Sequence, residues 1–268
     1  MGGMTERIEI DGLTLAYEDT GGEGPVVLFL HGLGGSANAW LAQLEACGQR
    51  GWRGIAYDQR GAGRSDKPPG PYSVEQWALD ACGLLDALGV GRTAIVGHSV
   101  GSMISAHAAG HLGERPWALA LCGGALAWRP EAGPVFERRV ELARAGRMDE
   151  IAAGVAITGL SSRCRAEDPR LLGLMQELIA SNDPSAYAEC SAATAPAAMP
   201  DLSALRCPLL AFCGSEDPVT PPEAAGLVAN AAPEGRTGVV EGAAHWCAIE
   251  DPDATNDVLF GFLDQLVT

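Results

Sequence analysis

A serine between two glycines follows an apolar run that has the pattern of a buried strand. Residues 97–101 read GHSVG, and the small residues of 100–110 that follow have the pattern of a helix. Between a strand and a helix, Gly-x-Ser-x-Gly is typical of a strained turn that exposes a nucleophilic hydroxyl, because the glycines leave room for close packing. The sequence therefore predicts that Ser99 is a nucleophile rather than part of an ordinary Ser-Gly turn.

A nucleophilic serine needs a base that takes its proton and an acid that orients the base. Among the five histidines, His245 follows the last predicted strand, so its loop can reach the serine from above. His98 is adjacent to Ser99, but a tight turn should point its ring away from the hydroxyl. The others are interpreted as packing, surface or loop-bracing residues: His31, His107 and His111.

The acid is expected directly after an earlier apolar strand. The run LLAFCGSEDP supplies two neighbouring carboxylates, and we choose Asp217 with Glu216 as the alternative. Pro218 ends this strand and stiffens the loop. The other strand end that could hold an acid, LALCGG, carries no carboxylate.

An oxyanion intermediate needs two backbone N–H groups near the nucleophile. One is expected from Val100, which follows the serine at the start of the helix. The other is expected from Leu33 in the glycine-rich run HGLGG, residues 31–35, with His31 bracing that loop.

A second glycine-containing loop, YDQRGAGRSDKP, lies at 57–68. It lacks the third glycine and the lysine of phosphate-binding loops. We interpret it as a structural loop in which three side chains hold one another: Asp58, Arg60 and Ser65.

The composition limits the partners and cofactors. The 268 residues carry a net charge of −16, which predicts a soluble chain that repels nucleic acid and anionic membranes. The eight cysteines are scattered without a Cys-x-x-Cys pair, which predicts buried thiols in a cytoplasmic protein, no metal site and no disulfide framework. We expect neither a signal peptide nor a membrane span, and the composition leaves a homo-oligomer open.

Apolar segments alternate with helical patterns along most of the chain, which predicts a doubly wound, mostly parallel sheet. Segment 124–200 breaks this alternation because it is helical and has no convincing strand. We therefore expect a core formed by 1–123 and 201–268, and a helical cap, 124–200, inserted before the strand that carries the acid. Such a cap would cover the carboxyl ends of the strands, where open sheets bind ligands.

The motifs together resemble the α/β-hydrolase superfamily over almost the whole chain, in the order HGLGG, DQRGAGRSDKP, GHSVGS, GSEDPVTPP and GAAHWCAIEDPDATNDVLFGFL. The order Ser99, Asp217, His245 is that of its catalytic triad. Segments GPYSVEQWALDACGLLDALGV, ERRVELARAGRMDEI and DPSAYAECSAATA look like the 3-oxoadipate enol-lactonase group, although the leading histidine of HGLGG departs from it. The resemblance implies a cofactor-free serine hydrolase that acts on a small ester or lactone.

The cap is rich in arginine although the chain as a whole is acidic. A guanidinium can bind a substrate carboxylate through two hydrogen bonds, and the lactone of the enol-lactonase group carries a free carboxylate. The first candidates are Arg129, near the end of the strand LALCGG, and Arg138, on the first cap helix. Trp128 and Trp246 are expected to form apolar walls of the site.

Two other functions use the same motifs. A carbon–carbon bond hydrolase would employ the same triad, and a tryptophan beside the catalytic histidine also resembles that group. A non-catalytic ligand-binding protein of the same fold would keep the pocket without turnover, which an intact triad argues against. A substrate panel separates the first alternative from the esterase, and labelling by a fluorophosphonate separates the second.

Overall fold

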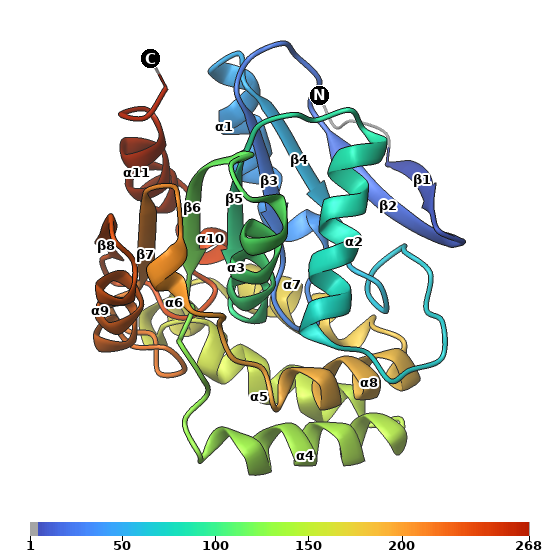
Figure 1. Ribbon diagram of the computed structural model, residues 1–268. Coiled ribbons are helices and arrows are strands. Elements are labelled where there is room, and N and C mark those ends of the chain that lie inside the picture. The colour runs from blue at the N-terminus through green and yellow to red at the C-terminus, as the bar shows by residue number, and fades with distance from the viewer. Residues whose placement is uncertain (1–4, 268) are drawn as a thin grey trace.

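The computed structural model describes residues 5–267, so residues 1–4 and 268 of the predicted core lie outside the described residues. Its centre is one sheet of eight strands in the order β1-β2-β4-β3-β5-β6-β7-β8 (Figure 1). The pairs β1–β2 and β2–β4 are antiparallel, and every other neighbouring pair is parallel. The predicted doubly wound, mostly parallel sheet is therefore confirmed. The strands are β1 (Glu6–Ile10), β2 (Leu13–Asp19), β3 (Val26–Leu30), β4 (Arg53–Tyr57), β5 (Thr93–His98), β6 (Pro116–Cys122), β7 (Leu209–Gly214) and β8 (Gly235–Val240).

Helices cover both faces of this sheet. One face is covered by α2 (Val74–Ala87), α3 (Val100–Leu112) and α9 (Pro222–Ala231), of which α2 and α3 lie in front of the sheet in Figure 1. The other face is covered by the 3-10 helix η1 (Ala37–Trp40), α1 (Leu41–Gln49), α10 (Cys247–Glu250) and α11 (Pro252–Leu263). Parallel strands covered on both faces must be apolar on both sides, which explains their continuous apolar runs.

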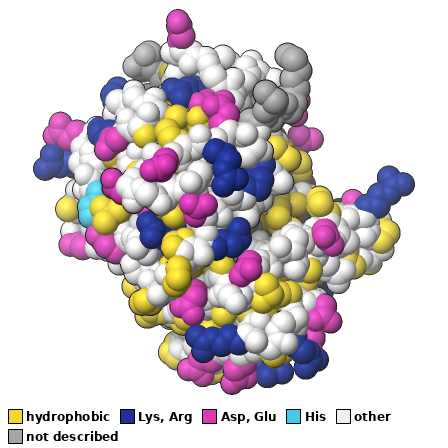
Figure 2. Space-filling view, turned by 90° about the vertical axis from the view of Figure 1, so that its right-hand side faces the viewer, with side chains coloured by type: hydrophobic (Ala, Val, Ile, Leu, Met, Phe, Trp, Pro, Cys, Tyr) yellow, Lys and Arg dark blue, Asp and Glu magenta, His cyan; other side chains and the backbone are white. Residues whose placement is uncertain are grey.

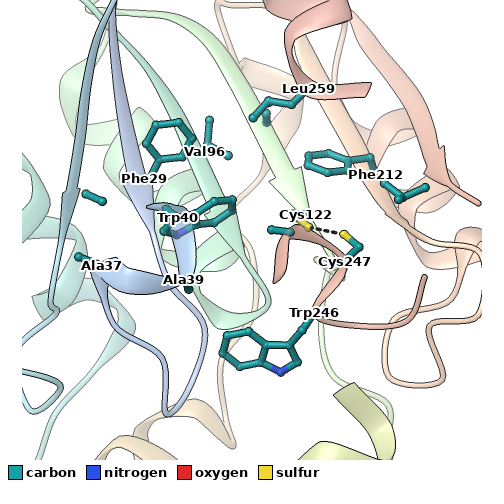
Figure 3. Packing of buried hydrophobic residues seen from close by; sticks show 14 of the residues in the cluster. Phe29, Ala37, Ala39, Trp40, Val96, Cys122, Phe212, Trp246, Cys247 and Leu259 are labelled. Atoms are coloured by element: carbon teal, nitrogen blue, oxygen red, sulfur yellow. Dashed lines mark hydrogen bonds between the residues drawn. The ribbon is translucent and has the colours of Figure 1, made fainter. Parts of the chain in front are cut away.

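Alternate residues of each central strand enter two separate hydrophobic clusters. Phe29 and Val96 pack on the side of α1 and α11, whereas Leu28 and Ile95 pack on the side of α2 and α3. Figure 3 shows the first cluster, in which Phe29 lies beside Trp40 with ring centroids 5.2 Å apart. This two-residue alternation fixes the strand register, because a shift by one residue would exchange the two faces.

Five further helices lie between β6 and β7, within segment 124–200. They are α4 (Ala132–Arg144), α5 (Met148–Gly159), α6 (Ser162–Glu167), α7 (Pro169–Ala180) and α8 (Pro184–Thr194). In Figure 1, α4, α5 and α8 extend across the carboxyl ends of the strands, as expected for a cap. An isolated bridge joins Ala127 to Ala198 where the chain leaves and re-enters the core. The limits of the cap as a separate domain stay a prediction.

Local signals in the sequence agree with most element ends. The Asp11-Gly12 turn joins β1 to β2 with positive φ at both residues, and Ser73 caps α2 by accepting the N–H of Gln76. Segment 37–49 forms two consecutive helices, η1 and α1. The final helix begins at Pro252, with Asp251 as its N-cap.

The surface mixes charges of both signs. On the face in Figure 2, acidic and basic side chains are interspersed rather than gathered by sign. Within residues 5–267, no helix has both the length and the apolar character needed to cross a membrane.

Candidate active site

Ser99 lies on a sharp turn between β5 and α3. Its φ of 55° and ψ of −122° lie in a region that non-glycine residues rarely adopt, which costs about 1–3 kcal/mol. The flanking glycines make the turn feasible. A Cβ at Gly97 would overlap the carbonyl of Gly101, and a Cβ at Gly101 would lie 2.5 Å from the carbonyl oxygens of Leu30 and His31. The Gly-x-Ser-x-Gly spacing is therefore a packing requirement of this turn.

His245 and Asp217 form a buried pair beside this turn. His245 Nδ1 lies 2.8 Å from Asp217 Oδ2, and both side chains are buried. Asp217 also accepts hydrogen bonds from the N–H groups of Val219 and Thr220 and from the Thr220 hydroxyl. Glu216, the alternative acid, is exposed to solvent. The structure thus pairs the histidine with Asp217.

An ionised Asp217 carboxylate beside His245 is the arrangement that lets a histidine act as a base. Burial alone would raise the pKa of Asp217, but the nearby His245 and the hydrogen bonds from His245 and Thr220 outweigh it and hold the pKa below its usual value. An ionised Asp217 fixes the proton of His245 on Nδ1 and leaves Nε2 free to accept a proton.

Ser99 and His245 line the same closed cavity, which has a volume of about 50 Å³ beneath the cap. Three other predicted site residues line it too: Leu33, Trp128 and Trp246. A cavity of this size has room for a few water molecules, whereas sites for small organic ligands usually exceed about 300 Å³. A substrate therefore requires the cap residues around the cavity to move apart.

The loop that carries Leu33 approaches the serine closely. A Cβ at Gly32 would lie 2.7 Å from His98 Nδ1 and 3.1 Å from Ser99 Cβ, so a larger residue there would displace its neighbours. Within the part of the chain that the structure describes, the N–H groups of Leu33 and Val100 donate no hydrogen bond. Two free donors beside the serine are what an oxyanion requires.

His31 braces this loop, as expected from the sequence. Its Nδ1 donates to the carbonyl of Gly32 at 2.8 Å, and its Nε2 accepts the N–H of Gln59 at 3.0 Å. Burial lowers the pKa of His31, which therefore stays neutral and keeps this donor–acceptor arrangement.

His98 has a contact that sequence reasoning did not find. Its Nε2 donates to the main-chain carbonyl of His245 at 2.8 Å. Its ring packs against His245 and Trp246, with centroids 4.8 Å and 4.6 Å apart. Burial, together with the nearby His245, lowers the pKa of His98 to about 3. A neutral ring thus holds the loop of His245.

This buried histidine predicts a loss of stability in acid. Between its ordinary pKa of 6.5 and the folded value of about 3, the unfolded chain binds a proton that the folded chain excludes. The free energy of unfolding should therefore fall with decreasing pH, by about 1.4 kcal/mol per pH unit from this group. Urea unfolding at pH 4, 5 and 6 should give a shallower slope for His98→Gln. Parallel slopes for the variant and the parent protein would contradict the assignment.

The cap arginines chosen from the sequence do not line the cavity, and this part of the hypothesis needs correction. Arg138 is exposed and pairs with Glu141 at 3.0 Å, while Arg129 donates to the carbonyl of Pro218. Arg139 lines the cavity instead. The buried Phe136 lies three residues before Arg139 on α4, so the two share one helix face. That spacing was the signal that could have identified Arg139.

The loop at 57–68 is structural, but its contacts differ in part from the expectation. The Ser65 hydroxyl donates to the carbonyl of Asp58, as expected. Arg60 does not join them, because its guanidinium pairs with Asp80 on α2 at 2.6 Å. Arg64 takes that place and donates to the Asp58 carboxylate at 2.9 Å.

Known proteins match this chain over most of its length. A family model described as the alpha/beta hydrolase fold matches residues 25–252. The protein named "Putative carbamate hydrolase RutD" of Azorhizobium caulinodans is 27% identical over 93% of this chain and 95% of its own. The 3-oxoadipate enol-lactonase 2 of Acinetobacter baylyi is 28% identical over 87% of this chain and 86% of its own.

Two solved structures have a similar arrangement throughout. A thermophilic esterase from Thermogutta terrifontis superposes with a TM-score of 0.91 and 28% identity, covering 98% of this chain and 100% of its own. The enol-lactonase from Burkholderia xenovorans gives a TM-score of 0.89 and 28% identity, covering 97% of this chain and 100% of its own.

Proposed function

This chain belongs to the α/β-hydrolase family, and from that premise we propose that it is a serine hydrolase which cleaves a small ester or lactone through an acyl-enzyme. The observation that carries the proposal is the buried 2.8 Å pair of His245 and Asp217, which lies at the same cavity as Ser99.

In the proposed reaction, Ser99 Oγ attacks the substrate carbonyl while His245 Nε2 takes its proton. The N–H groups of Leu33 and Val100 stabilise the oxyanion. As the bond to the leaving oxygen breaks, His245 returns the proton to that oxygen. Water then attacks the acyl-enzyme with His245 again as the base, which releases the acid and restores the serine. Asp217 orients the imidazole and stabilises its cationic form throughout.

The substrate class follows from the relatives and from the cavity lining. The two similar solved proteins are an esterase and an enol-lactonase by name, and both names denote acyl–oxygen cleavage. Six of the eleven residues that line the cavity are apolar, including Trp128 and Trp246, which favours a compact acyl group. These features support a small ester or lactone rather than a large substrate.

Labelling with a fluorophosphonate tests the mechanism, and a substrate panel tests the class. The probe should modify Ser99, identified by peptide mass spectrometry, and heat-denatured protein should remain unlabelled. The panel contains an enol-lactone, aryl esters, a carbamate and a vinylogous diketone at equal concentration. A preference for the diketone would favour the carbon–carbon bond hydrolase. Absence of labelling and of turnover would favour a ligand-binding role.

Arg139 is proposed to bind an anionic group of the substrate. Within residues 5–267 its guanidinium has no acidic partner within 4.0 Å and lies 5.8 Å from the Phe136 ring. Arg139→Gln should raise the KM of a carboxylate-bearing lactone about 10- to 100-fold, since a hydrogen bond to a charged group contributes about 1.5–3 kcal/mol. The KM of the corresponding neutral methyl ester should change little.

Arg138→Gln is the matched control, because it removes the same charge from the same helix outside the cavity. It should leave both KM values within about twofold, since an exposed charge pair contributes little. Equal effects of the two substitutions would show that the charge of the cap, and not a contact of Arg139, governs binding.

A further inference from the structure

Glu250 connects the cap to the loop that carries His245. Its carboxylate accepts the N–H of Ala244 at 2.9 Å, next to the histidine. It also accepts the N–H of Ser161 at 3.1 Å and the Ser161 hydroxyl, at the junction between α5 and α6. One side chain thus bonds to both segments.

The surroundings of Glu250 differ from those of a surface ion pair. Among the described residues, no lysine or arginine nitrogen lies within 4.0 Å of its carboxylate. Its partners are two backbone N–H groups and a hydroxyl, and Ser161 is buried. Both N–H groups donate to Glu250 Oε2, at 2.9 Å and 3.1 Å, and the Ser161 hydroxyl bonds to Oε1, so one carboxyl group bridges the two segments.

Further contacts hold the same loop from the cap and from the core. The N–H of Trp246 donates to the carbonyl of Gly159 at 2.9 Å, and a Cβ at Gly159 would lie 2.7 Å from the indole. On the core side, Cys247 Sγ lies 3.4 Å from Cys122 Sγ at the end of β6, with Trp246 beneath them in Figure 3. The histidine loop is therefore clamped between β6 and the α5–α6 junction.

The same cap segment lines the cavity. Val155 and Thr158 of α5 border it, and α5 ends at Gly159 where the loop is attached. A displacement of the α5–α6 junction would reach Ala244 through Glu250 and Trp246 through Gly159. Both residues flank His245, so the position of the histidine ring depends on the cap.

We propose that Glu250 is a positioning residue that ties the loop of His245 to the cap and thereby sets the distance between the histidine and Ser99. This inference rests on the proposed serine mechanism. Glu250 touches no substrate in this scheme, and its effect on the reaction passes through Ala244.

The test compares Glu250→Gln with Ser161→Ala and with Glu241→Gln. In Glu250→Gln the side chain loses its charge and one acceptor oxygen, which weakens its bonds to the N–H and the hydroxyl of Ser161. Ser161→Ala removes only the hydroxyl on the cap side. Glu241→Gln is the matched control, because Glu241 is exposed and lies on the same loop without a side-chain hydrogen bond to a described residue.

We expect Glu250→Gln to lower kcat and the rate of fluorophosphonate labelling about 10- to 100-fold, because a displacement of about 1 Å in a catalytic group can cost that much. KM should stay within about threefold, since Glu250 itself does not line the cavity. Ser161→Ala should also lower kcat without a matching change in KM, but by a smaller factor of about 3- to 10-fold. Glu241→Gln should match the parent protein.

Thermal unfolding separates this role from general destabilisation. All rates are measured at least 15 °C below each melting temperature, a margin of roughly three to five tenfold changes in the folding equilibrium. If Glu250→Gln does not fold, Ser161→Ala carries the test alone. Labelling at the parent rate by folded variants would overturn the inference while leaving the serine mechanism intact, and so would equal changes in KM and kcat. Failure of the parent protein to react at Ser99 would overturn both.

Discussion

Ser99→Ala should lower kcat by about 10⁴- to 10⁶-fold while the protein stays folded. The substitution removes the nucleophile, and what remains is the weak acceleration from binding and from the oxyanion donors. The backbone strain at this turn is the same for alanine and serine, so the melting temperature should change by no more than about 3 °C. Steady-state kinetics and thermal unfolding of the purified variant measure both quantities.

Ser102→Ala provides a contrast three residues away. The buried Ser102 hydroxyl donates to the carbonyls of Gly97 and Cys122, so its loss should destabilise the protein by about 1–2 kcal/mol. The kcat of Ser102→Ala should stay within about tenfold of the parent value, because the substitution removes no reacting group. Near-normal turnover of Ser99→Ala would mean that another group attacks the substrate and would reject the proposed mechanism.

Asp217→Asn should lower kcat by about 10⁴-fold with little change in KM. Asparagine nearly matches the shape of aspartate, but it cannot stabilise the imidazolium and it favours the wrong tautomer of His245. The corresponding change in serine proteases has an effect of this size. Because His245 Nδ1 lies 2.8 Å from the carboxylate, the loss should appear in kcat rather than in substrate binding.

Glu216→Gln is the natural comparison, since Glu216 precedes Asp217 and is exposed. We expect its kcat to lie within about threefold of the parent value, as for most surface substitutions. A larger loss in Glu216→Gln than in Asp217→Asn would mean that the acid was assigned to the wrong neighbour.

The sequence by itself predicted the type of fold and the segments that carry the proposed triad. Apolar runs without alternation, separated by helical patterns, indicate strands covered on both faces, and consecutive strands of that kind form parallel sheets. Ser99 and Asp217 each follow such a strand, and His245 follows the edge strand β8. Because the carboxyl ends of parallel strands meet at one edge of the sheet, residues far apart in the chain come together there.

Local stereochemistry also made the turns predictable. The glycines at 97 and 101 are required by close backbone contacts, and Ser73 caps the helix that follows it. These signals depend on a few neighbouring residues, so they are visible in the chain before any packing is known.

Only the tertiary structure decided which neighbouring side chain faces the site. Arg138 and Arg139 are identical side chains at neighbouring positions of α4. The burial of Phe136 fixes the rotation of this helix about its axis, and only Arg139 then faces the cavity. Asp217 is buried against His245 while Glu216 points to solvent. A rotation of about 100° separates Arg138 from Arg139 on the helix, and the turn after β7 separates Glu216 from Asp217; packing against distant segments fixes both.

The contacts of Glu250 and His98 could not be predicted from the sequence for the same reason. Glu250 meets Ser161 across 89 positions of the chain, and His98 meets His245 across 147. Neither pair has a spacing rule, because the first contact arises from the packing of the cap on the core and the second from the packing of two core segments. The chain therefore encodes the strand-end residues locally, whereas the folded packing of cap on core determines how the proposed catalytic histidine is held.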